Sequence, residues 1–350
     1  MSSATGPRWK AFPVSEFERR AADWNTLVSA AGYPPFLRSG FLSPALREFG
    51  TGREILAVCG SANHVAAMGI FASRMPGVWE TFQPSQMPLG AFVHDGVASL
   101  DQNLEHLLPA LPGVAGVVAI TQQDPAIVRR PANSLRLRTL DYVDTARVIV
   151  ARGFDEYWAA RGKNLRHNVK RQRAKLDEDR VPVRLDVVQA PGLVAQAIAD
   201  YGRLESAGWK AGAGTAVAPG NAQGRFYTAV FEAFCAVGAG RIYRYLFADK
   251  VVAMDLCIED PGVLVVLKTA YDETLRNVSP ASLMRHDYFR QIFDTGSVKR
   301  IEFYGKVMEW HKRWTDDVRT IYHVNRYRSP WLRAAHELLK RKSTDAAPAE

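Results

Sequence analysis

The alternation of apolar and polar positions predicts two halves that each combine helices with strands. In the first half, Phe17, Ala21, Trp24 and Val28 recur at spacings of three and four residues, which is typical of a helix with one buried face. The segments that follow predict a hairpin, a strand, a Pro- and Gly-bearing loop, a helix and a buried strand. They cover residues 53–73, 78–83, 84–90, 99–111 and 113–120.

The second half repeats this order. Two helices precede a hairpin, a strand, a Ser- and Pro-bearing loop, a helix and a strand, and one more alternating strand follows. These segments are residues 191–209, 225–238, 241–260, 262–272, 273–282, 283–296, 299–305 and 319–328. The repeated order predicts an α+β (α/β) fold with mixed sheets flanked by helices and an internal duplication. Coincidence is the alternative, because hairpins and helices are common.

The length of 350 residues, at about 150 residues per domain, predicts two domains. We place them at residues 1–150 and 151–330, with a C-terminal helix and polar tail over residues 331–350. No apolar run approaches the ~18 residues of a membrane span, and the N-terminus lacks the apolar segment of a secretory signal. The three cysteines stand apart among apolar neighbours, which favours a cytoplasmic location.

The net charge of +9 is concentrated in two segments. Residues 151–180 hold nine basic and five acidic side chains, and residues 299–342 hold twelve basic and five acidic ones. Such concentration favours a local anionic partner over general solubility.

The first of these segments contains "RGKNLRHNVKRQRAK", residues 161–175, with seven Lys or Arg and no acid. Leu165, Val169 and Leu176 form one apolar stripe at helical spacing, so we expect an amphipathic helix that ends near Leu176. Its charged side is expected to form a cleft wall, with a solvated face as the alternative.

Four segments carry a resemblance to a known family. They are "NLRHNVKRQRAKL", "LESAGWKAGAGTA", "LKTAYDETLRNVSPASLM" and "IEFYGKVMEWHKRW", in this order, across roughly residues 150–330. In them the second half resembles the GNAT-type acyltransferase domain of the cellulose-biosynthesis CelD/BcsL group, a relative of the FemABX aminoacyl transferases. The resemblance implies a tandem GNAT-like (acyl-CoA N-acyltransferase) fold whose N-terminal copy is degenerate.

The resemblance also implies acyl-CoA or another acyl thioester as co-substrate. Typical GNAT enzymes wrap the coenzyme A pyrophosphate with a Q/R-x-x-G-x-G/A loop, whereas the equivalent "RNVSPASL" has no glycine, which puts coenzyme A in doubt. The helix that follows can bind an anion through its first N–H groups. The candidate donor-binding residues are therefore Arg276, Asn277, Ser279 and Ser282, although Ser279 as a plain N-cap is the alternative.

Acyl transfer to an amine needs a base, donors for the developing oxyanion, and often an acid for the leaving group. The candidate catalytic residues are Glu205, Lys268, Asp272 and Tyr304, where the resemblance supplies the role of Tyr304 as a general acid. Lys268 and Asp272 fall on one strand face, so we expect them to form an ion pair that lines a cleft. A solvated strand end is the alternative for Lys268 and Asp272, and a helix end capped by Gly208 is the alternative interpretation of the segment with Glu205.

Other polar and aromatic residues are candidates for contact with substrate. They are Arg166, Lys170, Trp209, Lys210, Tyr271 and His311. Trp310 and Trp314 share a helical face, which predicts either an acyl-binding wall or, more simply, core packing. The loop at residues 84–90 is expected to shape a cleft between the domains, with Gln83, Ser85 and Gln86 as polar contacts. The histidine and cysteine spacings suit no metal site.

Three functions remain open from the sequence. The leading one is an acyltransferase that acylates an amine of a sugar, amino acid or cell-envelope precursor, with acyl-carrier protein as a further donor. A FemABX-like transferase that uses aminoacyl-tRNA is the second, and its binding should weaken steeply with salt. A non-catalytic accessory protein of polysaccharide assembly is the third.

Overall fold

The computed structural model describes residues 8–61, 64–207 and 217–345. The strands are β1 Arg8–Pro13, β2 Ile55–Ser61, β3 His64–Met75, β4 Val78–Thr81, β5 Phe92–His94, β6 Val117–Gln123, β7 Leu137–Ile149, β8 Val183–Val188, β9 Gly240–Phe247, β10 Lys250–Asp260, β11 Gly262–Tyr271, β12 Val298–Glu302 and β13 Val318–Tyr327. The helices are α1 Ala21–Ala30, α2 Ser39–Phe49, α3 Leu100–Glu105, α4 Phe154–Ala159, α5 Lys163–Glu178, α6 Val194–Ala207, α7 Ala222–Ala236, α8 Pro280–Thr295, α9 Glu309–Trp314 and α10 Pro330–Asp345.

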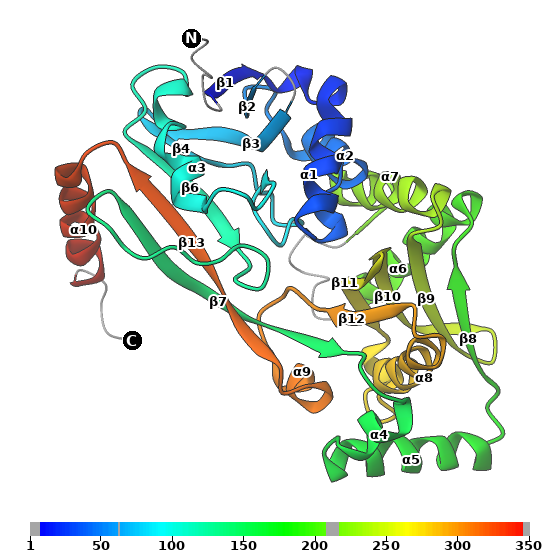
Figure 1. The fold of residues 1–350 in the computed structure, drawn as a ribbon. Helices are drawn as coiled ribbons and strands as arrows, with labels where there is room; N and C mark the ends of the chain where they lie inside the picture. The colour runs from blue at the N-terminus through cyan, green and yellow to red at the C-terminus, as the bar shows by residue number, and fades with distance from the viewer. Residues whose placement is uncertain (1–7, 62–63, 208–216, 346–350) are drawn as a thin grey trace.

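Within this described part of the chain, thirteen strands form one mixed sheet (Figure 1). Its order is β1-β2-β3-β4-β6-β13-β7-β12-β11-β10-β9-β8, and β5 pairs with β3. The predicted α+β architecture of mixed sheets flanked by helices is confirmed. Both predicted hairpins are present as β2–β3 and β9–β10.

The same pairing occurs in each half. In the first, β2, β3 and β4 pair antiparallel and β4 then pairs parallel with β6. In the second, β9, β10 and β11 pair antiparallel and β11 then pairs parallel with β12. The repeated order seen in the sequence is therefore also a repeated topology.

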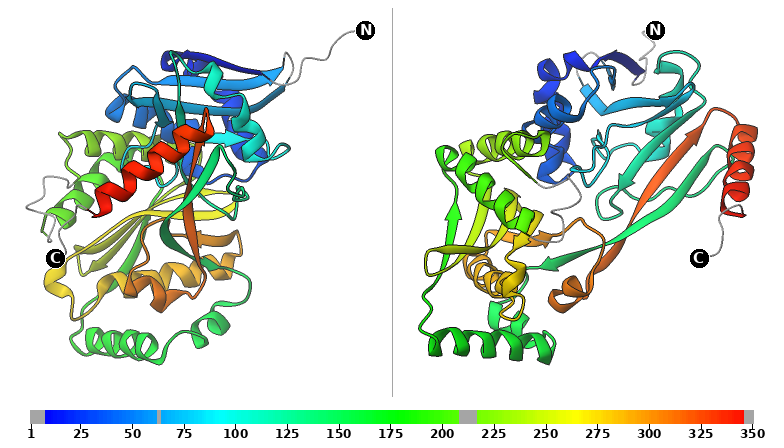
Figure 2. Two further views of the ribbon diagram at one scale, coloured as in Figure 1. Left: turned by 90° about the vertical axis from the view of Figure 1, so that its left-hand side faces the viewer. Right: turned by 180° about the vertical axis from the view of Figure 1, so that it is seen from behind.

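Two strands cross from one half to the other. The end of β7 pairs with β12, where Arg147 lies opposite Glu302. The strand β13 runs antiparallel to both β7 and β6, with Tyr322 opposite Gln123. The views in Figures 1 and 2 show these two strands as the long ribbons between the halves. The domain boundary at residue 150 stays a prediction, because β13 follows it in sequence yet pairs in the first half.

Buried apolar residues form two clusters that do not divide at residue 150. One spans the first half together with α6 and α7, and the other lies under the opposite face of the second half with α4, α5, α8 and α9. The two faces of β10 pack into different clusters, because successive residues of a strand point to opposite sides. Met254 lies in the first cluster and Ala253 in the second. Phe226 of α7 packs edge-on against Phe41 of α2 at 5.1 Å, so the first cluster joins the halves.

The basic segment forms the predicted amphipathic helix, α5. Leu165, Val169 and Leu176 are all buried, and the helix continues to Glu178, slightly beyond the predicted end. Arg173 pairs with Asp287 of α8, and α5 lies on the outer side of the second half, far from the first (Figure 2). Its charged face therefore does not form a wall between the halves, because the apolar stripe docks the helix on α4 and α8 instead.

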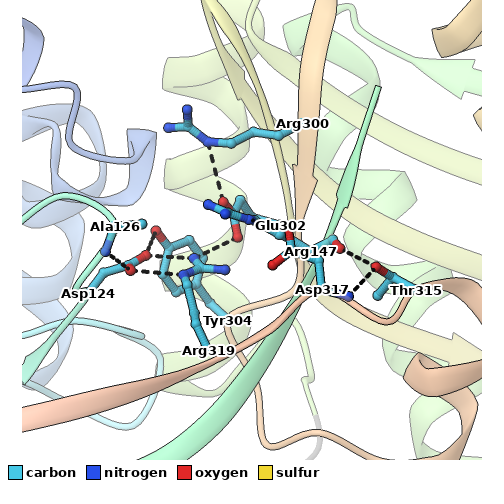
Figure 3. A network of polar contacts seen from close by, with 9 residues as sticks. All are labelled: Asp124, Ala126, Arg147, Arg300, Glu302, Tyr304, Thr315, Asp317 and Arg319. Atoms are coloured by element: carbon cyan, nitrogen blue, oxygen red, sulfur yellow. Dashed lines mark hydrogen bonds and ion pairs between the residues drawn. The ribbon is translucent and has the colours of Figure 1, made fainter. Parts of the chain in front are cut away.

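A buried charge network joins β13, β12 and the segment after β6 (Figure 3). Arg319 donates to both carboxylate oxygens of Asp124 at 2.8 and 2.6 Å, and to Glu302 at 2.8 Å. Tyr304 donates its hydroxyl to Asp124 at 2.8 Å. Arg319 holds the pKa of Asp124 below its ordinary value although burial opposes it, whereas burial raises the pKa of Glu302. One guanidinium thus bonds to two carboxylates from different halves.

Replacing Arg319 should strongly destabilise the fold. Arg319→Met leaves Asp124 and Glu302 buried without their shared cation, which should lower the free energy of unfolding by about 3–5 kcal/mol. The matched control is Arg300→Met, because Arg300 is about a third exposed and meets Glu302 at 3.3 Å, so its loss should cost less than ~1 kcal/mol. Urea denaturation measures both values, and equal losses would show that the network does not join the halves.

Candidate active site

A cavity of about 890 Å³ lies between the halves, where β11 and β12 diverge. Their parallel pairing ends at Val265 opposite Glu302, while β11 continues to Tyr271. Beyond that point the backbone N–H and C=O groups on this edge of β11 have lost β12 as a partner, so a ligand can pair with them. The lining residues come from both halves: Arg74, Glu80, Gln83, Pro84, Ser85, Gln86, Met87, Pro88, Thr121, Gln122, Tyr142, Val143, Gln223, Tyr227, Val266, Leu267, Lys268, Phe303, Tyr304, Gly305, Lys306 and His323. The predicted contacts Gln83, Ser85 and Gln86 are among them.

Lys268 is the central charged residue of this cavity. Its ammonium lies 3.0 Å from the carboxylate of Glu205, whose side chain is only 3% exposed. The rings of Tyr201 and Tyr227 lie 5.7 and 5.2 Å from the same ammonium. Glu205 also accepts the N–H of Val217 at 2.8 Å, which anchors it behind Lys268. The cavity lining thus contains a cation that is paired with a buried carboxylate and faces two aromatic rings.

The predicted ion pair between Lys268 and Asp272 is wrong. Asp272 accepts from Lys250 at 2.7 Å and from Thr274, and these bonds lower its pKa. It caps the short turn Glu273–Leu275 rather than lining the cavity. The sequence argument failed because Asp272 lies past the end of the strand, where alternation no longer fixes the side-chain direction.

Tyr304 lines the cavity, but its hydroxyl is engaged elsewhere. It donates to Asp124, and burial raises its pKa well above the ordinary value, so the phenol keeps its proton. A general-acid role for Tyr304 stays a prediction that requires this hydrogen bond to break.

Two non-glycine residues with left-handed backbone geometry meet at the cavity. Gln122 in β6 and Tyr304 after β12 both have a φ of 43°, and they occupy matching places in the two halves. Such conformations cost of order 1–3 kcal/mol and persist where the surrounding structure demands them, often at functional sites. Gln122 donates its N–H to Nδ1 of His323, so the neutral imidazole carries its proton on Nε2.

The candidate His311 lies in a separate cluster behind the sheet. It stacks on Trp310 with ring centroids 3.5 Å apart, and its Nδ1 accepts the N–H of Met308. Burial and the neighbouring Arg285 lower the pKa of His311 to about 4, so the imidazole is neutral at pH 7. It therefore cannot bind a substrate through a positive charge. Trp314 is core, as the simpler interpretation held, and Trp310 packs on the Arg285 guanidinium at 4.1 Å.

The loop before α8 does not form an open cradle of N–H groups. Several of its N–H groups already donate to carbonyls of the same segment, and they are those of Leu275, Arg276, Val278, Ser279 and Ser282. Ser279 has a φ of 49° and donates its hydroxyl to the carbonyl of Arg276, so it is not the predicted side-chain N-cap. The exposed Arg276 and Asn277 remain candidates for donor binding, whereas the geometry of Ser279 and Ser282 disfavours a phosphate cradle.

The remaining candidates do not gather at the cavity. Arg166 and Lys170 are exposed on α5, and Arg166 donates to the carbonyl of Arg161. Tyr271 is 37% exposed at the end of β11. The predictions for Trp209 and Lys210 fall outside the described residues.

Sequence reasoning missed several residues that the fold brings together. Tyr142 and His323 face each other at 4.7 Å in the cavity, on the crossing strands β7 and β13. Their pairing carries no local signal, because it depends on strands 180 residues apart. A second missed group is the fully buried pair of Arg285 with Asp255, to which Tyr288 and Thr269 also bond. The interrupted run "MDLC" in an otherwise apolar strand could have flagged Asp255.

Comparison with known proteins identifies the class. Residues 163–313 match the family described as an acetyltransferase (GNAT) domain. The matched segment contains Glu205, Lys268 and Tyr304. The second half therefore holds a GNAT acetyltransferase domain, and the protein is an acyltransferase. No curated protein matches the chain.

Solved structures resemble the whole chain in fold. FemX superposes with a TM-score of 0.56 at 8% identity, over 89% of this chain and 97% of FemX. A conserved protein of unknown function from Bacteroides thetaiotaomicron gives 0.55 at 11% identity, over 88% and 97%. A tandem GNAT protein from the clavulanic acid biosynthesis pathway gives 0.44 at 11% identity over 91% and 98%, too low to carry an argument. At these identities the likeness shows the fold alone.

Two further observations concern the described residues. Their His, Cys, Asp and Glu side chains form no group of three or more that could hold a metal ion. None of their helices has the length and apolar content needed to cross a membrane.

His311 should make stability depend on pH in one direction. Its folded-state pKa of about 4 lies below the ordinary 6.5, so the unfolded state binds a proton first as pH falls. The stability contribution is complete above pH 6.5 and is lost towards pH 4, by up to about 3 kcal/mol. His311→Gln should flatten this part of the profile in urea denaturation, whereas the exposed control His64→Gln should not; an unchanged His311→Gln profile would contradict the assignment.

Proposed function

We propose that the protein is an N-acyltransferase that works in the cavity between its halves. The observation that carries this is the Lys268–Glu205 pair, which places a fixed cation at the divergence of β11 and β12 inside the acetyltransferase domain. The donor is an acyl thioester, either acyl-CoA or acyl-carrier protein. The acceptor is an amine of a sugar, an amino acid or a cell-envelope or polysaccharide precursor. The three buried free cysteines support a cytoplasmic location.

The reaction follows from the charges of the cavity. The acceptor nitrogen attacks the thioester carbonyl carbon, the C–S bond breaks, and the thiolate leaves with the proton that the amine gives up. Negative charge develops first on the carbonyl oxygen and then on sulfur. We assign the Lys268 ammonium to stabilising that charge, because its pairing with Glu205 at 3.0 Å holds it in the cavity lining. Glu205 lies behind Lys268, so we assign it to positioning Lys268 rather than to base catalysis.

The charge balance of the lining points to an anionic substrate group. Arg74 and Glu80 pair with each other at 2.5 Å, while Lys306 is exposed at the cavity rim. Lys268 is likewise paired with Glu205, so Lys306 gives the lining its excess positive charge, which suits a carboxylate or phosphate on the acceptor or donor.

Aminoacyl-tRNA is the second candidate donor. The engaged N–H groups of the loop before α8 favour it, because they remove the cradle that a coenzyme A pyrophosphate would use. In the basic segment at residues 299–342, the exposed Lys306, Arg313 and Arg328 offer charge for an RNA backbone.

Turnover should depend on the Lys268 charge. Lys268→Met combined with Glu205→Gln removes the charge without leaving a buried carboxylate unpaired, and kcat should fall by about 10²–10³. Lys268→Arg should retain part of the activity, and the control Lys306→Ala, at the rim, should change KM more than kcat. Acyl-transfer assays on variants of equal fold stability measure these changes. Unchanged turnover in the double variant would show that Lys268 takes no part in the mechanism.

Ligand-induced stabilisation distinguishes the donors. Acyl-CoA at low salt should raise the Tm, and Arg276→Ala should reduce that gain, whereas Arg290→Ala on the far turns of α8 should not. Thermal shifts with coenzyme A, acyl-CoA, acyl-carrier protein and tRNA measure this. Stabilisation by tRNA alone, lost as salt rises, would replace the thioester donor with aminoacyl-tRNA.

A further inference from the structure

The inner face of α10 is firmly docked on the first half. Leu332 lies where a side chain on Gly116 would meet it at 3.5 Å, and His336 meets the hydroxyl of Tyr327 at 2.7 Å. Glu337 pairs with Arg138 at 2.5 Å and with Arg333 at 2.9 Å. These contacts fix the rotation of α10 about its axis, so the direction of its outer face is determined.

That outer face is apolar and open to solvent. Trp331 is 71% exposed and Leu338 is 59% exposed, and Ala334 and Ala335 are exposed between them. The spacing of three, four and seven residues places all four on one stripe. A surface helix normally turns such a stripe inward, so an outward stripe marks an interaction surface. Figures 1 and 2 show α10 at the margin of the molecule, beside the ends of β7 and β13.

The sequence around this stripe is basic. Residues 328–342 contain five Lys or Arg and one acid, and that acid is the inward Glu337. Lys340, Arg341 and Lys342 follow Leu338 almost directly in the sequence. Tryptophan and leucine on one side with basic residues around them is the composition of a helix that lies in a membrane interface.

We propose that α10 docks the protein on the surface of an anionic phospholipid bilayer. The Trp331 and Leu338 side chains enter the interfacial layer, and the basic charge of this part of the sequence draws the helix to the anionic surface. A second copy of the chain fits this face poorly, because a twofold contact would bring two basic segments together. The stripe of four side chains also falls short of the ~800 Å² per partner of a stable protein interface.

Vesicle sedimentation of the full chain tests the proposal. Binding is expected to phosphatidylcholine vesicles that contain about 30% phosphatidylglycerol at about 0.05 M salt, and to weaken at about 0.5 M salt. Trp331→Ala with Leu338→Ala should lower the bound fraction on the order of tenfold. The matched control, Val97→Ala with Leu193→Ala, removes equally exposed apolar side chains elsewhere and should bind as the parent does. Lys340→Glu with Arg341→Glu should also lower binding.

Three outcomes would overturn the proposal. Equal binding to pure phosphatidylcholine would remove the role of charge, and undiminished binding of the Trp331 and Leu338 double variant would remove the role of the stripe. An oligomer in light scattering that this double variant dissolves would show that a second copy, not lipid, covers α10. None of these readouts involves Lys268, so the proposal stands or falls apart from the acyl-transfer chemistry.

Discussion

A single buried guanidinium holds together the parts on which the site depends. Arg319, on the crossing strand β13, bonds to Asp124 of the first half and to Glu302 of the second. Within the low-dielectric interior, each carboxylate would be costly without this shared cation. The same contact orients Tyr304 and keeps β12 beside β7. The divergence of β11 from β12, and hence the cavity, therefore rests on a junction of charge rather than on apolar packing alone.

The two halves share a topology but contribute different residues to the cavity. Each half has a pair of parallel strands that separate, and each has a left-handed residue, Gln122 or Tyr304, at that point. The first half contributes polar side chains from its loop at residues 84–90 to the cavity, and the second contributes Lys268. In the proposed mechanism Lys268 is an electrostatic group rather than a general base, because its ammonium lies 3.0 Å from Glu205 and faces the rings of Tyr201 and Tyr227.

Two basic amphipathic helices that look alike in the sequence, α5 and α10, pack differently on the molecule. The basic helix α5 and the basic C-terminal helix α10 are both amphipathic, yet they dock in opposite ways. The stripe of α5, with Leu165 and Val169, is buried against α8 and leaves a charged outer face. The stripe of α10, with Trp331 and Leu338, faces outward because ion pairs and a small-residue contact hold its other side. Local pattern alone does not distinguish these two outcomes.

The sequence by itself determined the α+β class, both hairpins and the docked stripe of α5, since these follow from periodicity over short spans. Only the tertiary structure decided which charges pair. Lys268 meets Glu205 of the helix α6 rather than Asp272, and Arg319 of β13 meets Asp124, which lies 195 residues earlier, because the tertiary fold brings these distant segments together. Long-range strand pairing leaves no trace in local alternation, and it is this pairing that creates the cavity.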